Sequence, residues 1–176
     1  MVYLFLGDGF EEAEAIRTAD VLRRCGAELE LVSVMDRLDV KGAHGIIVTA
    51  DVTVNDITDD GEMYILPGGM GGVENLTKCE KLCNILKSTD SRIAAICAAP
   101  TLLEKLGLLR NKKAICYPSL TEELTDATVT NERVVTDGRI TTSMGPGTSF
   151  DFGFELAGLL KGKEVAENVK KAMLVK

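Results

Sequence analysis

One cysteine has surroundings in the sequence that favour chemistry. Cys97 directly follows the apolar run Arg92–Ile96 and precedes a short predicted helix, so it lies at a sharp turn from strand to helix. The unpaired N–H groups and the positive dipole end of a helix stabilise a thiolate, which is the reactive form of cysteine. The sequence therefore predicts that Cys97 is an exposed nucleophile with a lowered pKa.

A glutamate near the N-terminus is the candidate partner of this thiol. Glu14 lies on the helix predicted after the first strand, one to two turns from the loop that precedes it. Burial would raise the pKa of such a carboxyl toward neutrality, which suits proton transfer, whereas the start of a helix acts in the opposite direction. Glutamates in an acidic run such as Glu11–Glu14 are usually solvated, so the spacing alone leaves the role of Glu14 open.

Chemistry at a carbonyl group also needs donors for the oxygen that gains negative charge. Backbone N–H groups of a glycine-rich turn, or of the residue after the nucleophile, are the usual donors. Gly68 and Gly69 follow a predicted strand, and Ala98 follows Cys97. A glycine turn after a strand is usually only a tight turn, but together with the cysteine it predicts an oxyanion site.

The remaining cysteines favour packing over chemistry. Cys79 and Cys83 share one apolar helical stripe, Cys25 ends a helix and Cys116 lies in a strand. His44 is the one histidine of the chain, and it falls in an irregular segment far from the predicted turn at the nucleophile. We therefore expect no metal site and no conventional cysteine–histidine pair.

Composition limits the classes of function. The 176 residues, of which 45% are hydrophobic, suffice for one core, so we expect a single domain over residues 1–176. A net charge of −7 without basic clusters indicates no nucleic-acid or membrane partner. The five scattered cysteines indicate free thiols in the cytoplasm, and the apolar start without a basic leader indicates an unprocessed protein.

The elements that must position these residues alternate between strands and helices. Strands are predicted at 1–6, 27–35, 63–66, 92–96, 114–116, 134–136 and 139–142, with a hairpin-like excursion at 41–56. Helices are predicted at 11–25, 78–88, 101–106, 148–160 and 164–172. This alternation predicts a largely parallel sheet with helices on both faces and an antiparallel ribbon at one end. The loops after Leu6, Leu66 and Ile96 should then meet at the carboxyl edge of the strands, where such sheets bind ligands.

Four segments, in this order, resemble the DJ/ThiJ/PfpI superfamily and within it the short branch that includes protein deglycases. They are Gly9–Glu14, Leu66–Gly69, Ala94–Pro100 and Thr142–Ser149. The resemblance spans nearly the whole chain. It implies a flavodoxin-like α/β three-layer sandwich that works without a cofactor and forms a homodimer.

The resemblance also assigns roles to individual residues. It implies that Cys97 is the nucleophile, that Glu14 is hydrogen-bonded to it, and that Gly69 and Ala98 supply oxyanion N–H groups. Residues expected at the pocket or the dimer interface are Arg24, His44, Tyr117 and Pro146.

Two positions depart from the pattern of the superfamily. Peptidase-like members carry a histidine directly after the cysteine, where this chain has Ala98. The deglycase branch commonly carries a histidine before the proline of the next strand, where Tyr117 stands here, with an unperturbed pKa of about 10. Mechanisms that depend on either histidine are therefore disfavoured.

The function expected from the resemblance is a glyoxalase or deglycase that acts on methylglyoxal, glyoxal or their early adducts with amines and thiols, including glycated proteins. A redox-sensing chaperone, in which Cys97 is oxidised without turnover, is the alternative. Thiazole monophosphate biosynthesis and cysteine amidase or peptidase activity have less support. Gly145–Ser149 could hold a phosphate at a helix N-terminus, but a helix start with a fixed entry angle explains the segment better.

Overall fold

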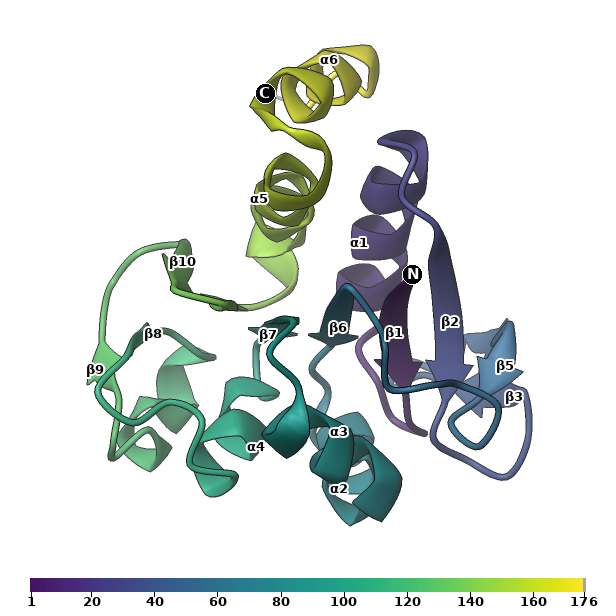
Figure 1. The fold of residues 1–176 in the computed structure, drawn as a ribbon, viewed down its shortest axis with the longest axis vertical. Coiled ribbons are helices and arrows are strands. Elements are labelled where there is room, and N and C mark those ends of the chain that lie inside the picture. The colour runs from purple at the N-terminus through teal and green to yellow at the C-terminus, as the bar shows by residue number, and fades with distance from the viewer. Residues whose placement is uncertain (176) are drawn as a thin grey trace.

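A seven-stranded sheet forms the centre of the computed structural model, which describes residues 1–175 (Figure 1). Its strand order is β10-β11-β7-β6-β1-β2-β5, and every neighbouring pair is parallel except β10 and β11. The strands are β1 (Val2–Leu6), β2 (Leu29–Ser33), β5 (Val52–Thr53), β6 (Met63–Leu66), β7 (Arg92–Ile96), β10 (Val134–Asp137) and β11 (Ile140–Ser143). The predicted flavodoxin-like α/β sandwich is confirmed, including the antiparallel ribbon at one end.

Helices cover both faces of this sheet. In Figure 1, α1 (Glu12–Arg24), α5 (Ser149–Lys161) and α6 (Lys163–Ala172) lie on one side of the sheet, and α2 (Met70–Lys78), α3 (Glu80–Ser88) and α4 (Pro100–Lys105) lie on the other. Side chains of a strand alternate between faces, so Leu4 of β1 belongs to the core under α1 and α5, whereas Phe5 belongs to the core over α2, α3 and α4. Strands buried on both faces explain the continuous apolar runs of the sequence.

Smaller elements lie around the sheet. They are the antiparallel pair β3 (Asp39–Lys41) and β4 (Ile47–Thr49), the parallel pair β8 (Lys113–Ala114) and β9 (Thr128–Val129), and the 3₁₀ helices η1 (Pro118–Glu123) and η2 (Pro146–Thr148). The hairpin-like excursion predicted at 41–56 is confirmed as the pair β3 and β4, although its first strand starts earlier, at Asp39. The sequence pattern did not predict η1 or β9.

The glycine-rich segment after β6 was expected to end the strand and to supply oxyanion donors, and no helix was predicted before residue 78. The segment begins helix α2, which the extended conformation of Cys79 separates from α3. A Cβ atom on Gly72 would lie 2.7 Å from the Cα atom of Phe10, so glycine allows α2 to approach the loop after β1 closely. The glycines that suggested a turn therefore serve close packing.

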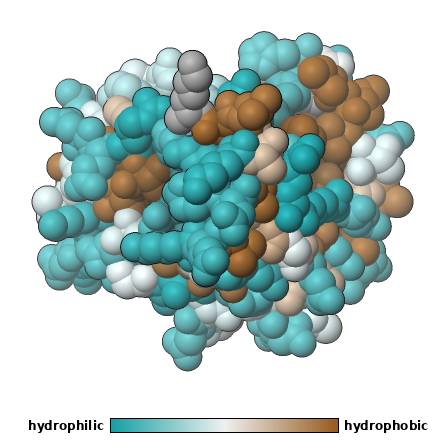
Figure 2. Space-filling view, turned by 90° about the horizontal axis from the view of Figure 1, so that it is seen from above, coloured by the Kyte–Doolittle hydropathy of each residue, from teal (hydrophilic) through white to brown (hydrophobic). Residues whose placement is uncertain are grey.

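The loops after β1, β6 and β7 meet at one edge of the sheet, as predicted. The Glu11 N–H donates to the Gly68 carbonyl at 3.0 Å, which joins the first two of these loops. Within the described residues, no helix is long and apolar enough to cross a membrane. Seen from the α6 end, most of the surface is hydrophilic and its apolar side chains form separate patches (Figure 2).

Candidate active site

Cys97 lies at the turn from β7 into α4, where the backbone takes a left-handed conformation with φ +64°. For a residue with a Cβ atom this conformation costs roughly 1–3 kcal/mol, so the surroundings must hold it. The Cys97 N–H donates to the Ser143 carbonyl at 2.9 Å, and the Cys97 carbonyl accepts from the Tyr117 N–H at 2.8 Å. The strained turn leaves the thiol half-buried, at the carboxyl edge of the sheet.

Glu14 comes from the first turn of α1, closer to the helix start than predicted, and its side chain is within hydrogen-bonding reach of the Cys97 thiol. Glu14 is only 1% exposed to solvent. Its Oε2 accepts the Gly68 N–H at 2.7 Å, and its own N–H donates to Glu11 Oε2 at 2.7 Å. Its Oε1 is buried and has no hydrogen-bond partner among residues 1–175. The carboxyl group is therefore fixed by one oxygen and available through the other.

Burial raises the pKa of Glu14 to about 7, although the hydrogen bonds to Gly68 and Cys97 act in the opposite direction. The negative charge of Glu11 adds to the rise. A carboxyl group in this range exchanges its proton readily near neutral pH, which is the property of an effective general acid or base.

The resting thiol does not have the lowered pKa that the sequence predicted. Burial, the negative charge of Glu14 and the hydrogen bond to its carboxylate raise the pKa of Cys97 to about 12. The N–H groups of Gly69 and Ala98 donate toward the sulfur and lower its pKa, but they do not outweigh burial. The prediction is wrong because the turn that provides N–H groups also places the sulfur in a desolvated site beside an acid.

Two successive glycines shape the space around the sulfur. A Cβ atom on Gly68 would lie 2.6 Å from both Cys97 Cβ and Glu14 Oε2. Gly69 has φ +86°, and a Cβ atom there would lie 2.2 Å from the Gly9 carbonyl oxygen. Glycine at both positions is therefore required if the N–H of residue 68 is to reach the acid and that of residue 69 the thiol.

Tyr117 and Gly145 border the same site. The ring of Tyr117 comes within 3.3 Å of the position that a Cβ atom on Gly145 would take, and Glu14 Oε1 lies 3.9 Å from that position. Tyr117 is 46% exposed. Pro146, the next residue, lies in η2 and accepts through its carbonyl from Arg17 and Ser149. Sequence reasoning treated Gly145 only as part of a helix start or phosphate site and did not place it beside Glu14 and Tyr117.

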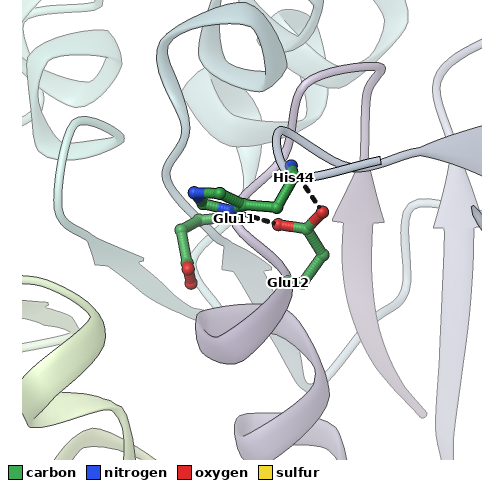
Figure 3. A group of neighbouring side chains, drawn as sticks. All are labelled: Glu11, Glu12 and His44. Carbon is green, nitrogen blue, oxygen red and sulfur yellow. Dashed lines mark hydrogen bonds and ion pairs between the residues drawn. The ribbon is translucent and has the colours of Figure 1, made fainter. Parts of the chain in front are cut away.

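Arg24 and His44, which were expected at the pocket or the dimer interface, do not border the thiol site, and their place at an interface stays a prediction. Arg24 ends α1 and pairs with Asp20 at 2.9 Å on an exposed helix face. His44, in the turn between β3 and β4, donates its backbone N–H to Glu12 at 2.7 Å, and its Nδ1 lies 2.8 Å from the same carboxylate. Figure 3 shows both interactions between His44 and Glu12. Sequence reasoning missed Glu12, which attaches this turn to the start of α1.

Glu11, Glu12 and His44 bring three potential metal ligands within 4.8 Å of one another. The Glu12 carboxylate, however, already accepts the N–H groups of His44 and Ile46 and contacts the imidazole ring. No dashed line in Figure 3 reaches Glu11. The arrangement is that of a structural anchor for the turn.

Comparison with known proteins agrees with the fold and with the resemblance found in the sequence. The model of the DJ-1/PfpI family matches residues 1–159. Protein DJ-1 homolog A of Arabidopsis thaliana is 43% identical over 99% of this chain, which corresponds to 46% of that protein. The chain thus spans about half the length of the first curated relatives it matches.

Other matches extend over nearly all of both chains. The glutathione-independent glyoxalase DJR-1.2 of Caenorhabditis elegans is 31% identical, over 93% of this chain and 89% of that protein. The crystal structure of Drosophila melanogaster DJ-1beta superposes with a TM-score of 0.96 at 34% identity, covering 99% of this chain and 97% of that one. The chain belongs to the DJ-1/PfpI family.

Proposed function

We propose that the protein is a cofactor-independent glyoxalase or deglycase that acts on methylglyoxal, glyoxal or their early adducts. The observation that carries the proposal is the buried Glu14, with a pKa of about 7, within hydrogen-bonding reach of the Cys97 thiol. Two backbone N–H groups, of Gly69 and Ala98, face the same sulfur. The glyoxalase name of the nematode relative supports this class of reaction.

Attack of the sulfur on the aldehyde carbon is the first step. As the S–C bond forms, the thiol proton passes to the Glu14 carboxylate, and the carbonyl electron pair moves onto the aldehyde oxygen. The N–H groups of Gly69 and Ala98 stabilise this oxyanion. Glu14 then returns the proton to the oxygen and leaves a hemithioacetal on Cys97. The thiol need not be ionised before the reaction, because Glu14 accepts its proton during the attack.

Isomerisation and hydrolysis complete the reaction. Glu14 removes the proton from the former aldehyde carbon and delivers it to the neighbouring ketone carbon, while the hydroxyl proton moves to the ketone oxygen. The product is a lactoyl thioester on Cys97. Water then adds to the thioester, the C–S bond breaks, and the thiol regains its proton. The oxidation of one carbon balances the reduction of its neighbour, so lactate forms without an external oxidant.

An early adduct reacts by displacement, because its adduct carbon already bears a hydroxyl group and has no carbonyl for addition. Cys97 displaces the thiol or amine of the carrier from the adduct carbon, and that group leaves with the proton. Tyr117 forms the wall of the site where the resemblance led us to expect a histidine, so Glu14 is assigned every proton transfer.

Loss of methylglyoxal without glutathione tests the proposal. We expect wild-type protein to consume it, and Cys97→Ser to lower the rate at least hundredfold, because the nucleophile is lost. Cys83→Ser, at a half-buried cysteine on α3, is the matched control and should leave turnover unchanged. Equal turnover by wild type and Cys97→Ser would refute the proposal.

We also propose that the protein is a homodimer in the cytoplasm. Ile16 of α1 and Ile46 and Ile47 next to the turn at His44 are large apolar side chains exposed to solvent. Glu12 and His44 hold these two segments together, so an apolar contact surface would extend across both. The free state of all five cysteines fits a reducing compartment.

Oxidation of Cys97 without turnover is the second candidate function. The N–H groups of Gly69 and Ala98 that face the sulfur could also hold the oxygens of a sulfinate. The raised pKa of the resting thiol argues against this second candidate, since sensor cysteines are low-pKa thiolates. Peptide mapping after mild peroxide distinguishes the two, because a sensor requires selective oxidation of Cys97 over the other four cysteines.

A further inference from the structure

Three hydrogen bonds form a closed ring at the start of α1. The Glu11 N–H donates to the Gly68 carbonyl at 3.0 Å, and the Gly68 N–H donates to Glu14 Oε2 at 2.7 Å. The Glu14 N–H closes the ring by donating to Glu11 Oε2 at 2.7 Å. The ring joins the candidate base, Glu14, to the loop 67–69, which supplies the N–H group of Gly69 to the sulfur.

The side chain of Glu11 makes one bond of this ring and its backbone makes another. Glu11 is the N-cap residue of α1, and a side-chain acceptor at this position satisfies an N–H group that the helix leaves free. The N–H group that it satisfies belongs to Glu14, whose carboxyl group faces the Cys97 thiol. The cap therefore fixes the stretch of backbone from which that carboxyl group extends.

The loop 67–69 also packs directly against the backbone of Glu11. A Cβ atom on Gly69 would lie 2.7 Å from the Glu11 nitrogen, so the two backbones are in contact with no room for a side chain between them. A displacement of Glu11 would therefore move Gly69 as well as Glu14. One residue thus bears on both the candidate base and an oxyanion donor.

Glu11 also places a negative charge near Glu14. This like charge favours the protonated carboxyl group and raises the pKa of Glu14. The elements that face Glu14 contribute two other ionisable groups, those of Cys97 and Tyr117, and the loop 67–69 contributes none. Removal of the Glu11 charge should therefore act directly on Glu14.

The other charged groups near Glu11 are engaged elsewhere. Glu12 and His44 lie within 4.8 Å of it but pair with each other, and Figure 3 shows the Glu11 carboxylate turned away from that of Glu12. Arg17, three residues after Glu14 on α1, donates to the Pro146 carbonyl at 3.3 Å. The bond from the Glu14 N–H is thus the side-chain bond that Glu11 makes among residues 1–175.

We propose that Glu11 is a positioning residue of the candidate active site, which holds the Glu14 carboxyl group and the Gly69 N–H in place around the Cys97 sulfur. The inference rests on the proposed function and adds to it a residue that acts through two others. Loss of the Glu11 side chain should therefore impair the chemical step more than substrate binding, because the groups it misplaces act during bond formation.

Three variants separate the hydrogen bond of Glu11 from its charge. Glu11→Asp keeps both, Glu11→Asn keeps an N-cap acceptor without the charge, and Glu11→Ala removes both. We expect kcat for methylglyoxal to fall about tenfold in Glu11→Ala while KM stays within about twofold of wild type. Glu11→Asp and Glu11→Asn should restore kcat to within about threefold of wild type, because the cap is present.

The pH dependence of Cys97 alkylation isolates the effect of the charge. The inflection in Glu11→Asn should lie about half a pH unit below that in Glu11→Asp, since loss of a neighbouring negative charge favours the Glu14 carboxylate. A role of residue 11 in helix stability alone would leave the inflection in place. The same pair of variants in a His44→Gln background removes any contribution from titration of the imidazole.

Two controls match these changes away from the ring. Asp20→Ala removes the exposed pair with Arg24 and tests the effect of a less stable α1. Glu28→Gln removes one exposed negative charge just before β2, at the opposite edge of the sheet. Both should preserve kcat and the inflection, and thermal melting shows that each variant is folded at the temperature of the assay.

Full kcat in folded Glu11→Ala would overturn the inference, and so would identical inflections in Glu11→Asp and Glu11→Asn. If Glu11→Ala does not fold, the comparison of Glu11→Asp with Glu11→Asn decides by itself. Absence of methylglyoxal turnover by wild type would instead refute the proposed function. The alkylation profiles need no turnover, so they would still decide whether Glu11 acts on Glu14.

Discussion

At the scale of single residues, the proposed chemistry depends on the transfer of a proton from the Cys97 thiol to the Glu14 carboxylate. Near pH 7 Glu14 changes its charge, whereas the thiol keeps its proton until far higher pH. Movement of that proton from sulfur to carboxyl creates the nucleophile and the acid in the same event. The Gly68 N–H bond to Oε2 and the burial of Oε1 fix the geometry of this transfer.

The raised pKa of Glu14 has a consequence for stability. Its ordinary value of 4.5 applies to the unfolded chain, so folding favours the protonated form, and the native state loses stability as pH rises from 4.5 through about 7. Glu14→Gln removes this loss. We expect the variant to be more stable than wild type by up to about 3 kcal/mol at pH 8, and by much less at pH 4. Urea unfolding at both pH values measures the difference, and a gain that does not depend on pH would contradict the account.

At the scale of elements, the ion pair of His44 with Glu12 of α1 is one of several contacts that attach the turn between β3 and β4. The hydrogen bond and charge of Glu12 raise the pKa of His44. Burial opposes ionisation of Glu12, but the hydrogen bonds from His44 and the backbone outweigh it and lower its pKa. The pair therefore stabilises the turn while the imidazole is charged.

The pH dependence of this pair can be tested with His44→Gln, which keeps a polar side chain without the charge. A raised folded-state pKa contributes stability that is fully present below the ordinary value of 6.5 and is lost as pH rises through the folded value. We expect the variant to have a lower melting temperature than wild type at pH 6 and a smaller deficit at pH 9. Equal deficits at the two pH values would show that the charge is irrelevant.

The elements that could be predicted are those with a strong local pattern in the sequence. The predictions were close for the buried strands β1, β6 and β7 and for helix α1. A strand buried on both faces is a continuous apolar run, and a helix buried on one face has apolar residues at helical spacing. Helix α2 was missed because its glycines, which serve packing against Phe10, have the lowest intrinsic preference for helix apart from proline.

The residues of the candidate site could be predicted from the sequence and the resemblance, but the pKa of the thiol could not. Sequence and resemblance named Cys97 and Glu14, which the structure places within hydrogen-bonding reach. The pKa of the thiol was predicted in the wrong direction, because the burial and charge around the sulfur come from segments far apart in the chain, such as those of Glu14 and Gly68.

At the scale of the whole molecule, the exposed isoleucines bear on assembly. Ile47→Glu places a charge in the contact surface proposed around the exposed Ile16, Ile46 and Ile47, and the proposed homodimer would have to bury it. We expect analytical ultracentrifugation to show a dimer for wild type and a shift toward monomer for the variant. Val165→Glu, at an exposed apolar residue of α6, is the control and should remain dimeric. A wild-type monomer at micromolar concentration would contradict the proposal.

The most direct test of proton transfer from Cys97 to Glu14 is the rate of Cys97 alkylation as a function of pH. The rate is measured by peptide mass mapping, in wild type and in Glu14→Gln. In wild type the rate should rise with an inflection near pH 7, where Glu14 becomes able to accept the thiol proton. In Glu14→Gln the inflection should move above pH 9, since burial raises the thiol pKa and no base remains, and the rate at pH 7.5 should fall at least tenfold. The same inflection in both proteins would contradict the account.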